Sequence, residues 1–149
     1  MNRDSPRHTV ILDWDGTMVP AEWPGQPTKF MPGAVEACHA LSRAGVRLTV
    51  HSARMNPYDP WSGKLLPQGE VARQKAYIRY TLDSQGLTYI DIWDKPGKPS
   101  GSAYVDDKGF RYSGTRGAWR AMTNTLLLHL KVEAPTFPAT PGSDTLEAP

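Results

Sequence analysis

Two aspartates with one residue between them, Asp13 and Asp15, follow the apolar residues 10–12 in the segment TVILDWDGTMVP. Side chains two residues apart in an extended chain lie on the same face. Both carboxylates can therefore face the same ligand, while the side chain of Trp14 points the other way into the core. Two like charges this close cost free energy unless something offsets them. The pair therefore indicates a site that binds a cation or exchanges protons at the end of a buried strand.

Polar side chains end two further segments that read as strands. Ser52 and Arg54 follow VRLTVH, Asp106 and Asp107 follow SAYV, and Lys98 lies shortly before that last segment. Ligands of open α/β sheets bind at the carboxyl ends of parallel strands, so these residues are expected to converge. Four uncompensated carboxylates would repel one another, and an oxygen-rich site of this kind suits Mg²⁺.

The order of these residues resembles the four motifs of the haloacid dehalogenase-like (HAD) phosphohydrolases. DWDGT is similar to the first motif of that family, Ser52 in LTVHSAR to the second, a lysine to the third, and the acidic pair in AYVDD to the fourth. The resemblance covers residues 10–130, and KPSGSAYVDDKGFRYSG is especially similar to the end of small members that lack a cap. It implies a Rossmann-like three-layer α/β sandwich with a mainly parallel central sheet and no cap domain.

The resemblance also implies a role for each residue in phosphate-ester hydrolysis through an aspartyl-phosphate. Asp13 is expected to be the nucleophile, and Asp15 the acid that protonates the leaving oxygen and later activates water. Gly16 lets the chain turn sharply after the strand. The implied phosphate or substrate contacts are Thr17, Ser52, Arg54 and Lys98, and the implied Mg²⁺ ligands are Asp13, Asp15 (through its backbone carbonyl), Asp106 and Asp107.

Several assignments stay open at this point. Arg54 either reaches the substrate or pairs with an acid, and DKPGKP offers both Lys95 and Lys98, of which Lys98 fits the family spacing better. The substrate is a nucleotide, a sugar phosphate or the 3′-phosphate end of a nucleic acid. The alternative to an enzyme is a catalytically weak HAD-fold module that binds or regulates.

Strand and helix signals alternate along the chain, which is typical of an α/β fold with parallel strands. Strands are expected at 9–14, 46–52, 89–93, 102–107 and 109–114. Helices are expected at 33–44 and 69–84, followed by an amphipathic last helix carrying Trp119, Met122, Leu126 and Leu130. A proline-rich flap (18–32) and a substrate loop (55–69) complete a core of residues 1–131, and 132–149 form a proline-rich flexible or extended tail.

The composition sets the protein class. The chain has 149 residues, of which 39% are hydrophobic and 21% charged, and its formal net charge is +2. These values are those of one soluble domain, and they do not by themselves indicate binding to nucleic acid or to a membrane. Cys38 is the single cysteine and is expected in the core, so disulfides and cysteine zinc sites are excluded. We expect a cytoplasmic protein whose partner is its phosphorylated substrate, with no membrane and no obligatory protein partner.

Overall fold

The computed structural model describes residues 8–109 and, beyond them, Thr115, Gly117, Ala118, Ala121, Asn124, Thr125, Leu128 and His129. The chain divides into two compact units, Met1–Gly109 and Phe110–Pro149. The boundary predicted after residue 131 falls within the second unit and stays a prediction.

A parallel four-stranded sheet forms the centre of the first unit. Its elements follow the order β1 (His8–Leu12), α1 (Ala34–Arg43), β2 (Val46–Val50), the short 3₁₀ turn η1 (Ala53–Met55), α2 (Glu70–Asp83), β3 (Asp91–Ile92) and β4 (Ala103–Val105). The strands lie in the order β3-β2-β1-β4, and every pair is parallel. The predicted α/β fold with a parallel central sheet is confirmed.

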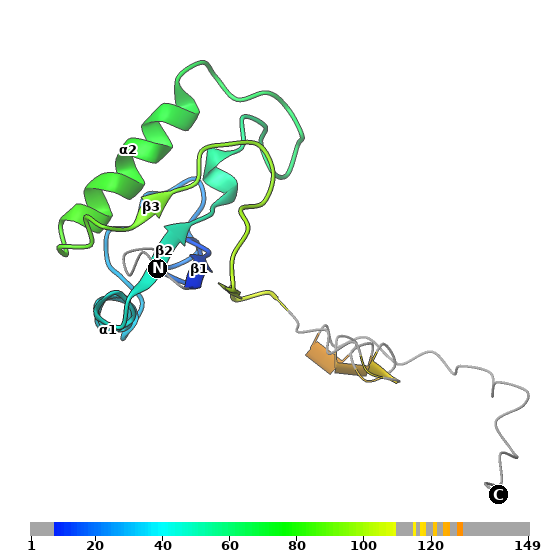
Figure 1. Ribbon diagram of the computed structural model, residues 1–149. Helices are drawn as coiled ribbons and strands as arrows, with labels where there is room; N and C mark the ends of the chain where they lie inside the picture. The colour runs from blue at the N-terminus through cyan, green and yellow to red at the C-terminus, as the bar shows by residue number, and fades with distance from the viewer. Residues whose placement is uncertain are drawn as a thin grey trace, which may run out of the picture. The chain divides into compact units, whose positions relative to one another are not determined.

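Both helices cover the same face of this sheet (Figure 1). Alternate residues of the strands, Leu12, Leu48 and Val50, pack with helix residues such as Ile78 and Leu82 in one buried cluster. Two successive right-handed crossovers that step in the same direction place their helices on the same side, which explains this layer. The described residues thus supply the sheet and one helical layer; a second helical layer would have to come from residues outside them.

The element bounds differ from those predicted by a few residues at each end. Helix α2 follows Gly69, whose φ of 85° places it in the left-handed region, and α1 follows Gly33 in the same way (φ 79°). Strand β3 has two residues rather than the five of YIDIW, because Ile90 donates its backbone N–H to Leu87 in a turn instead of to a neighbouring strand. Neither the flap nor the substrate loop holds a separate domain in the described structure.

In the second unit, the described residues 118, 121, 124, 125, 128 and 129 are helical, as predicted for the last helix. The apolar residues assigned to its packing face, Trp119, Met122, Leu126 and Leu130, lie outside the described residues. So do most of the strand expected at 109–114 and the whole tail, 132–149. Among the residues that are described, no helix has the length and apolar character needed to cross a membrane.

Candidate active site at the carboxyl edge of the sheet

Three of the four predicted acidic residues come together beyond the ends of β1 and β4. Asp13, Asp106 and Asp107 each offer one carboxylate oxygen, and these oxygens lie within 4.8 Å of one another. The sheet register produces this contact: Leu12 pairs with Val105, and the Asp13 N–H donates to the Val105 carbonyl at 2.9 Å. We call these three residues the acid cluster.

The acid cluster carries a high electrostatic cost in the absence of a cation. Burial raises the pKa of Asp13 from 3.8 to about 6, and the charges of Asp106, Asp107 and Asp15 add to this effect, although a backbone hydrogen bond at Trp14 opposes it. Neighbouring oxygens around an octahedral Mg²⁺ lie about 3 Å apart and opposite ones about 4 Å apart, given bonds of about 2.1 Å. An all-oxygen cluster of this size fits that ion.

The turn after Asp13 fastens the two halves of the acid cluster together. The Thr17 hydroxyl donates to Asp13 Oδ2 at 3.4 Å and accepts from the Asp107 backbone N–H at 3.1 Å. Gly16 has a φ of 82°, and a Cβ at this position would lie 2.4 Å from Asp107 Oδ2. The backbone conformation therefore favours glycine here, and any side chain at this position would also have to displace the Asp107 carboxylate. Thr17 thus links the turn to Asp107, and its predicted contact with substrate stays a prediction.

Trp14 points away from the acid cluster, as the alternation of residues predicted. Its side chain is fully buried and makes edge-to-face contacts with Phe30 and Tyr77. Its indole N–H donates to the Tyr77 hydroxyl at 3.2 Å. Packing in the core therefore holds Trp14 in place, and this restricts the orientation of the backbone that carries Asp13 and Asp15.

The carboxylate of Asp15 lies outside the acid cluster and is held by Arg54. Arg54 Nε donates to Asp15 Oδ2 at 2.8 Å, and Nη2 donates to Oδ1 at 2.7 Å. The Arg54 side chain is only 1% exposed. Of the two roles left open for Arg54, the structure shows pairing with an acid. Metal binding by Asp15 through its backbone carbonyl stays a prediction.

Ser52 lies at the end of β2, where the motif order placed it. It is buried, and its hydroxyl oxygen accepts the Arg54 backbone N–H at 3.1 Å, which caps the η1 turn. A hydroxyl that accepts one bond keeps its hydrogen for another acceptor. Ser52 thus retains the donor that a phosphate oxygen would need.

The two candidate lysines lie in different surroundings. Lys98 Nζ is 3.8 Å from the centre of the Tyr104 ring, whereas Lys95 lies over Trp93 at 5.6 Å. Burial lowers the pKa of His51 and the charge of Lys98 lowers it further, while Asp106 acts in the opposite direction. The charges of Lys98 and of Asp106, a member of the acid cluster, therefore both act on His51. The assignment of the phosphate-binding role to Lys98 rather than Lys95 stays a prediction.

Sequence reasoning missed Gln74 and gave His51 no place near the site. Gln74 is buried and accepts a hydrogen bond from Arg54 Nη1 at 2.9 Å. It shares the helical spacing of Val71 and Ile78, so a polar residue on an apolar stripe was the signal that could have found it. His51 directly follows β2 and carried no comparable signal.

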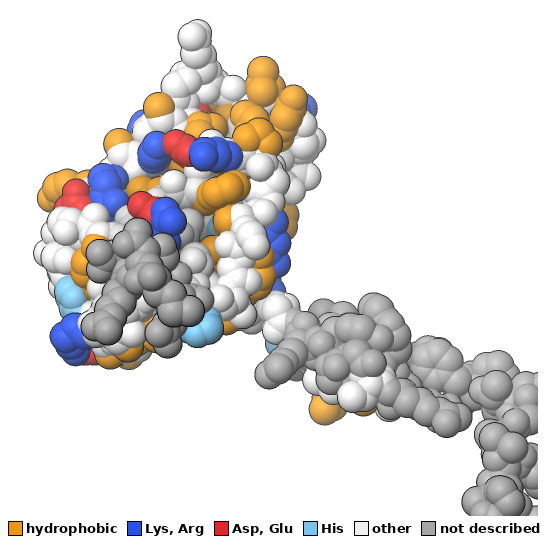
Figure 2. Space-filling view, in the orientation of Figure 1, with side chains coloured by type: hydrophobic (Ala, Val, Ile, Leu, Met, Phe, Trp, Pro, Cys, Tyr) orange, Lys and Arg blue, Asp and Glu red, His pale blue; other side chains and the backbone are white. Residues whose placement is uncertain are grey.

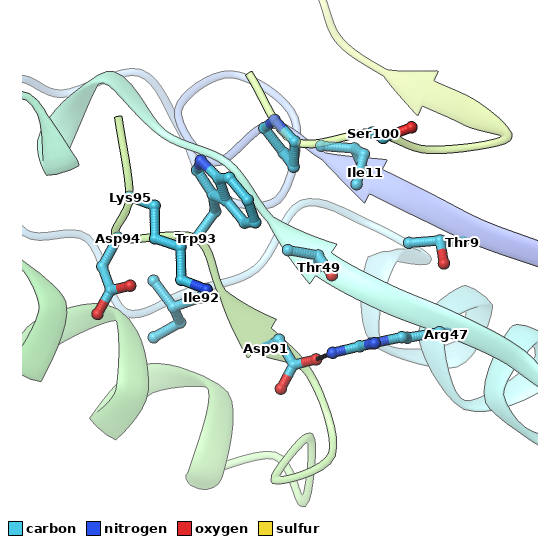
Figure 3. Close-up of a pocket in the computed structure, with 11 residues that line it drawn as sticks. Thr9, Ile11, Arg47, Thr49, Asp91, Ile92, Trp93, Asp94, Lys95 and Ser100 are labelled. Atoms are coloured by element: carbon cyan, nitrogen blue, oxygen red, sulfur yellow. Dashed lines mark hydrogen bonds and ion pairs between the residues drawn. The ribbon is translucent and has the colours of Figure 1, made fainter. Parts of the chain in front are cut away.

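A cavity of about 280 Å³ lies on the sheet face opposite the two helices (Figure 3). Thr9 and Thr49 point into it from the strands, Trp93 and Lys95 come from the segment after β3, and Arg47 and Asp91 form an ion pair at one end. Of the residues considered for the site, only Lys95, the alternative to Lys98, lines this cavity. The predicted chemistry thus lies at the edge of the sheet and not in this hollow.

Comparison with known proteins identifies no family. No protein-family model matches the chain, and no curated protein matches its sequence. A solved structure, described as that of a conserved protein coded by a locus of Bacteroides thetaiotaomicron, is similar with a TM-score of 0.49 and 21% identity. The match covers 80% of this chain and 91% of that one. A likeness at this level says nothing about the chemistry of either protein.

Proposed function

We propose that this chain is a Mg²⁺-dependent phosphomonoesterase that works through an aspartyl-phosphate on Asp13. The observation that supports the proposal most strongly is the meeting of Asp13 with Asp106 and Asp107 at the carboxyl edge of the sheet. Asp13, Asp106 and Asp107 would hold Mg²⁺, which would neutralise charge on the carboxylates and on the phosphoryl oxygens when bound.

The reaction consists of two displacements at phosphorus. An oxygen of Asp13 forms a bond to phosphorus, the bond from phosphorus to the leaving oxygen breaks, and that oxygen takes a proton from Asp15. Water then attacks phosphorus in the aspartyl-phosphate and gives a proton to Asp15. The bond from phosphorus to the Asp13 oxygen breaks, so that phosphate is released and the Asp13 carboxylate is restored. The Ser52 hydroxyl and the Lys98 ammonium would orient and balance the phosphoryl oxygens.

The substrate loop, which follows η1 after the end of β2, offers exposed side chains for the rest of the substrate. In the substrate loop, Tyr58 and Leu65 form an isolated antiparallel bridge and remain 52% and 70% exposed, and Trp61 between them is 82% exposed. Figure 2 shows hydrophobic side chains gathered where Figure 1 draws the loop between η1 and α2. Exposed aromatic rings suit stacking on a nucleobase, so we favour a nucleotide or a 3′-phosphorylated nucleic-acid end over a sugar phosphate.

Turnover of an aryl phosphate, with Mg²⁺ and with EDTA, tests the proposal directly. The wild-type chain should release phosphate only with Mg²⁺, and Asp13→Asn should lower kcat at least about 1000-fold because the nucleophile is lost. Activity that survives both EDTA and this substitution would refute the mechanism. A panel of nucleotides, sugar phosphates and 3′-phosphorylated oligonucleotides, compared by kcat/KM, identifies the substrate class.

The pair Lys98→Met and Lys95→Met tests which lysine serves phosphate. Lys98→Met should lower kcat/KM about 100-fold, since a cation beside a phosphoryl group acts mainly in the transition state. Lys95→Met changes the same charge outside the predicted site and should alter kcat/KM less than about twofold. The reverse order of effects would assign the role to Lys95.

The Arg54 contact also supports the second candidate, a catalytically weak module that binds or regulates. Arg54 occupies both carboxylate oxygens of Asp15, so an Asp15 that stays in this contact would not reach a substrate. Such a module would bind Mg²⁺ and a phosphorylated ligand, measurable by calorimetry, and show no turnover on the full substrate panel.

A further inference from the structure

The guanidinium of Arg54 is a buried charge that takes no direct part in either displacement of the proposed reaction. Its side chain is 1% exposed, and its partner Asp15 is 24% exposed. A buried ion pair is weak evidence for stability, because the cost of desolvating both charges can exceed their attraction. Packing alone would be served as well by an apolar side chain of similar volume. The contacts of Arg54 suggest a different reason for keeping a charge there.

On one side, Arg54 is anchored to α2. Its Nη1 donates to Gln74 Oε1 at 2.9 Å, and the Gln74 amide in turn donates to Glu70 Oε1 at 2.7 Å. Arg54 also lies over the ring of Tyr77 at 5.2 Å. Both partners, Gln74 and Tyr77, belong to α2, so the guanidinium has a fixed position relative to the core.

On the other side, Arg54 holds the flap, residues 18–32. Its Nη2 donates to the Gly25 carbonyl at 2.7 Å, and its guanidinium lies 5.0 Å from the centre of the Trp23 ring. The same Nη2 donates to Asp15 Oδ1 at 2.7 Å, so its two hydrogens are divided between the flap and Asp15. A displacement of either acceptor leaves a buried donor without its partner, which is unfavourable.

We propose that Arg54 is a positioning residue that fixes the carboxylate of Asp15 and couples its orientation to the flap. The flap and the proton-transferring carboxylate therefore change position together, and a substrate that displaces Gly25 also frees Asp15. This inference rests on the proposed function for its catalytic consequence. The coupling itself concerns three described groups and does not depend on turnover.

The first experiment measures the coupling without activity. Asp15→Asn keeps the shape of the side chain but turns an amide N–H toward Arg54, so it should loosen the flap. We expect hydrogen exchange in peptides covering residues 18–32 to become at least about fivefold faster, with α1 unchanged. The same exchange rate in the flap as in wild type would overturn the proposal, whether or not the chain is an enzyme. If exchange in the flap is faster in Asp15→Asn and the wild-type chain hydrolyses no phosphate ester, the coupling is upheld and the phosphatase proposal is refuted.

The second experiment tests the positioning of Asp15 by a double-substitution cycle. Arg54→Lys keeps the charge but loses the two-point contact, and should lower kcat about 10–100-fold with KM and Mg²⁺ affinity changed less than threefold. In the Asp15→Asn background the same change should have less than a twofold effect, because Arg54 acts through Asp15. Multiplicative losses, or a loss of Mg²⁺ affinity, would show a general structural role and overturn the proposal.

Arg47 provides a matched control for that substitution. It also binds an aspartate through Nε and Nη2, at 2.9 and 2.7 Å from Asp91 Oδ2, but on the exposed surface of the sheet. Arg47→Lys should leave kcat and flap exchange unchanged within twofold. If Arg54→Lys proves too unstable to assay, Gln74→Leu removes the α2 anchor while keeping the ion pair, and it should lower kcat at least threefold with KM unchanged. An unchanged kcat in folded Gln74→Leu would overturn the anchoring argument.

Discussion

Asp13→Asn should stabilise the metal-free protein while it removes the proposed nucleophile. The side chain of Asp13 is partly buried and faces two other carboxylates. Burial, with a contribution from Asp106, Asp107 and Asp15, raises its pKa from 3.8 to about 6. Asparagine copies the protonated shape without the charge, so it removes the cost that the folded chain bears when Asp13 ionises.

The size and pH range of this effect follow from that shift. At about 1.4 kcal/mol for each tenfold change in proton affinity, it corresponds to about 3 kcal/mol. Because Asp13 keeps some contact with water, we expect about 1–2 kcal/mol. The folded chain binds this proton more tightly than the unfolded chain. The stability that the group contributes is therefore fully present below pH 3.8 and is lost as the pH rises to about 6.

Urea unfolding in EDTA at several pH values measures this difference between wild type and Asp13→Asn. The variant should be more stable by the full amount above about pH 6 and equal to wild type near pH 3.5. Mg²⁺ should reverse the order, because it stabilises only the chain that binds it well. Asp106→Asn is the graded control and should give a smaller gain, since it removes one contributor and leaves the burial of Asp13. A variant less stable than wild type at pH 7.5 in EDTA would refute the electrostatic reasoning.

Three further predictions concern sites where packing is decisive. Gly16→Ala should weaken Mg²⁺ binding about 10-fold or more in calorimetry, because its Cβ would lie 2.4 Å from Asp107 Oδ2 and displace that carboxylate. An unchanged affinity would show that Asp107 does not bind the metal. Gly101→Ala should destabilise the chain by about 1–3 kcal/mol in urea, since its Cβ would lie 2.6 Å from Ile11 Cγ1, and equal stability would contradict this close approach. Burial raises the pKa of Cys38 from 9.0 to about 11, so iodoacetamide at pH 8 should modify the native chain at least about 100-fold more slowly than the urea-unfolded chain.

The meeting of Asp13 with Asp106 and Asp107 could be predicted because it depends on strand direction. In a parallel sheet the residues that follow paired strands come out at the same edge, whatever the detailed packing. The pairing of Leu12 with Val105 then brings Asp13 and Asp106 together without further information. The burial of Trp14 follows in the same way from the alternation of side chains along the chain.

The partners of the long side chains could not be predicted. Arg54 has several rotatable bonds, and its backbone position beside Ser52 allows contact with either a substrate or Asp15. The choice depends on Gln74 and Gly25, which lie 20 residues after it and 29 residues before it in the sequence. Local pattern carries no information on such contacts. The choice between Lys95 and Lys98 was open for the same reason, because the segment after β3 has no regular structure to fix its direction.

The division of the four acids changes the charge balance that the sequence suggested. The sequence predicts four carboxylates around one cation. In the structure, the buried guanidinium of Arg54 pairs with Asp15, and the carboxylates of Asp13, Asp106 and Asp107 lie together. A divalent cation would then leave the acid cluster with one net negative charge, which still repels a phosphate ester. Binding of an anionic substrate therefore needs a further positive group on the open side, and Lys98 is the cation whose charge reaches His51 together with that of Asp106. We therefore propose separate tasks for the two cations: Arg54 orients the carboxylate of Asp15, and Lys98 binds the anionic phosphoryl group of the substrate.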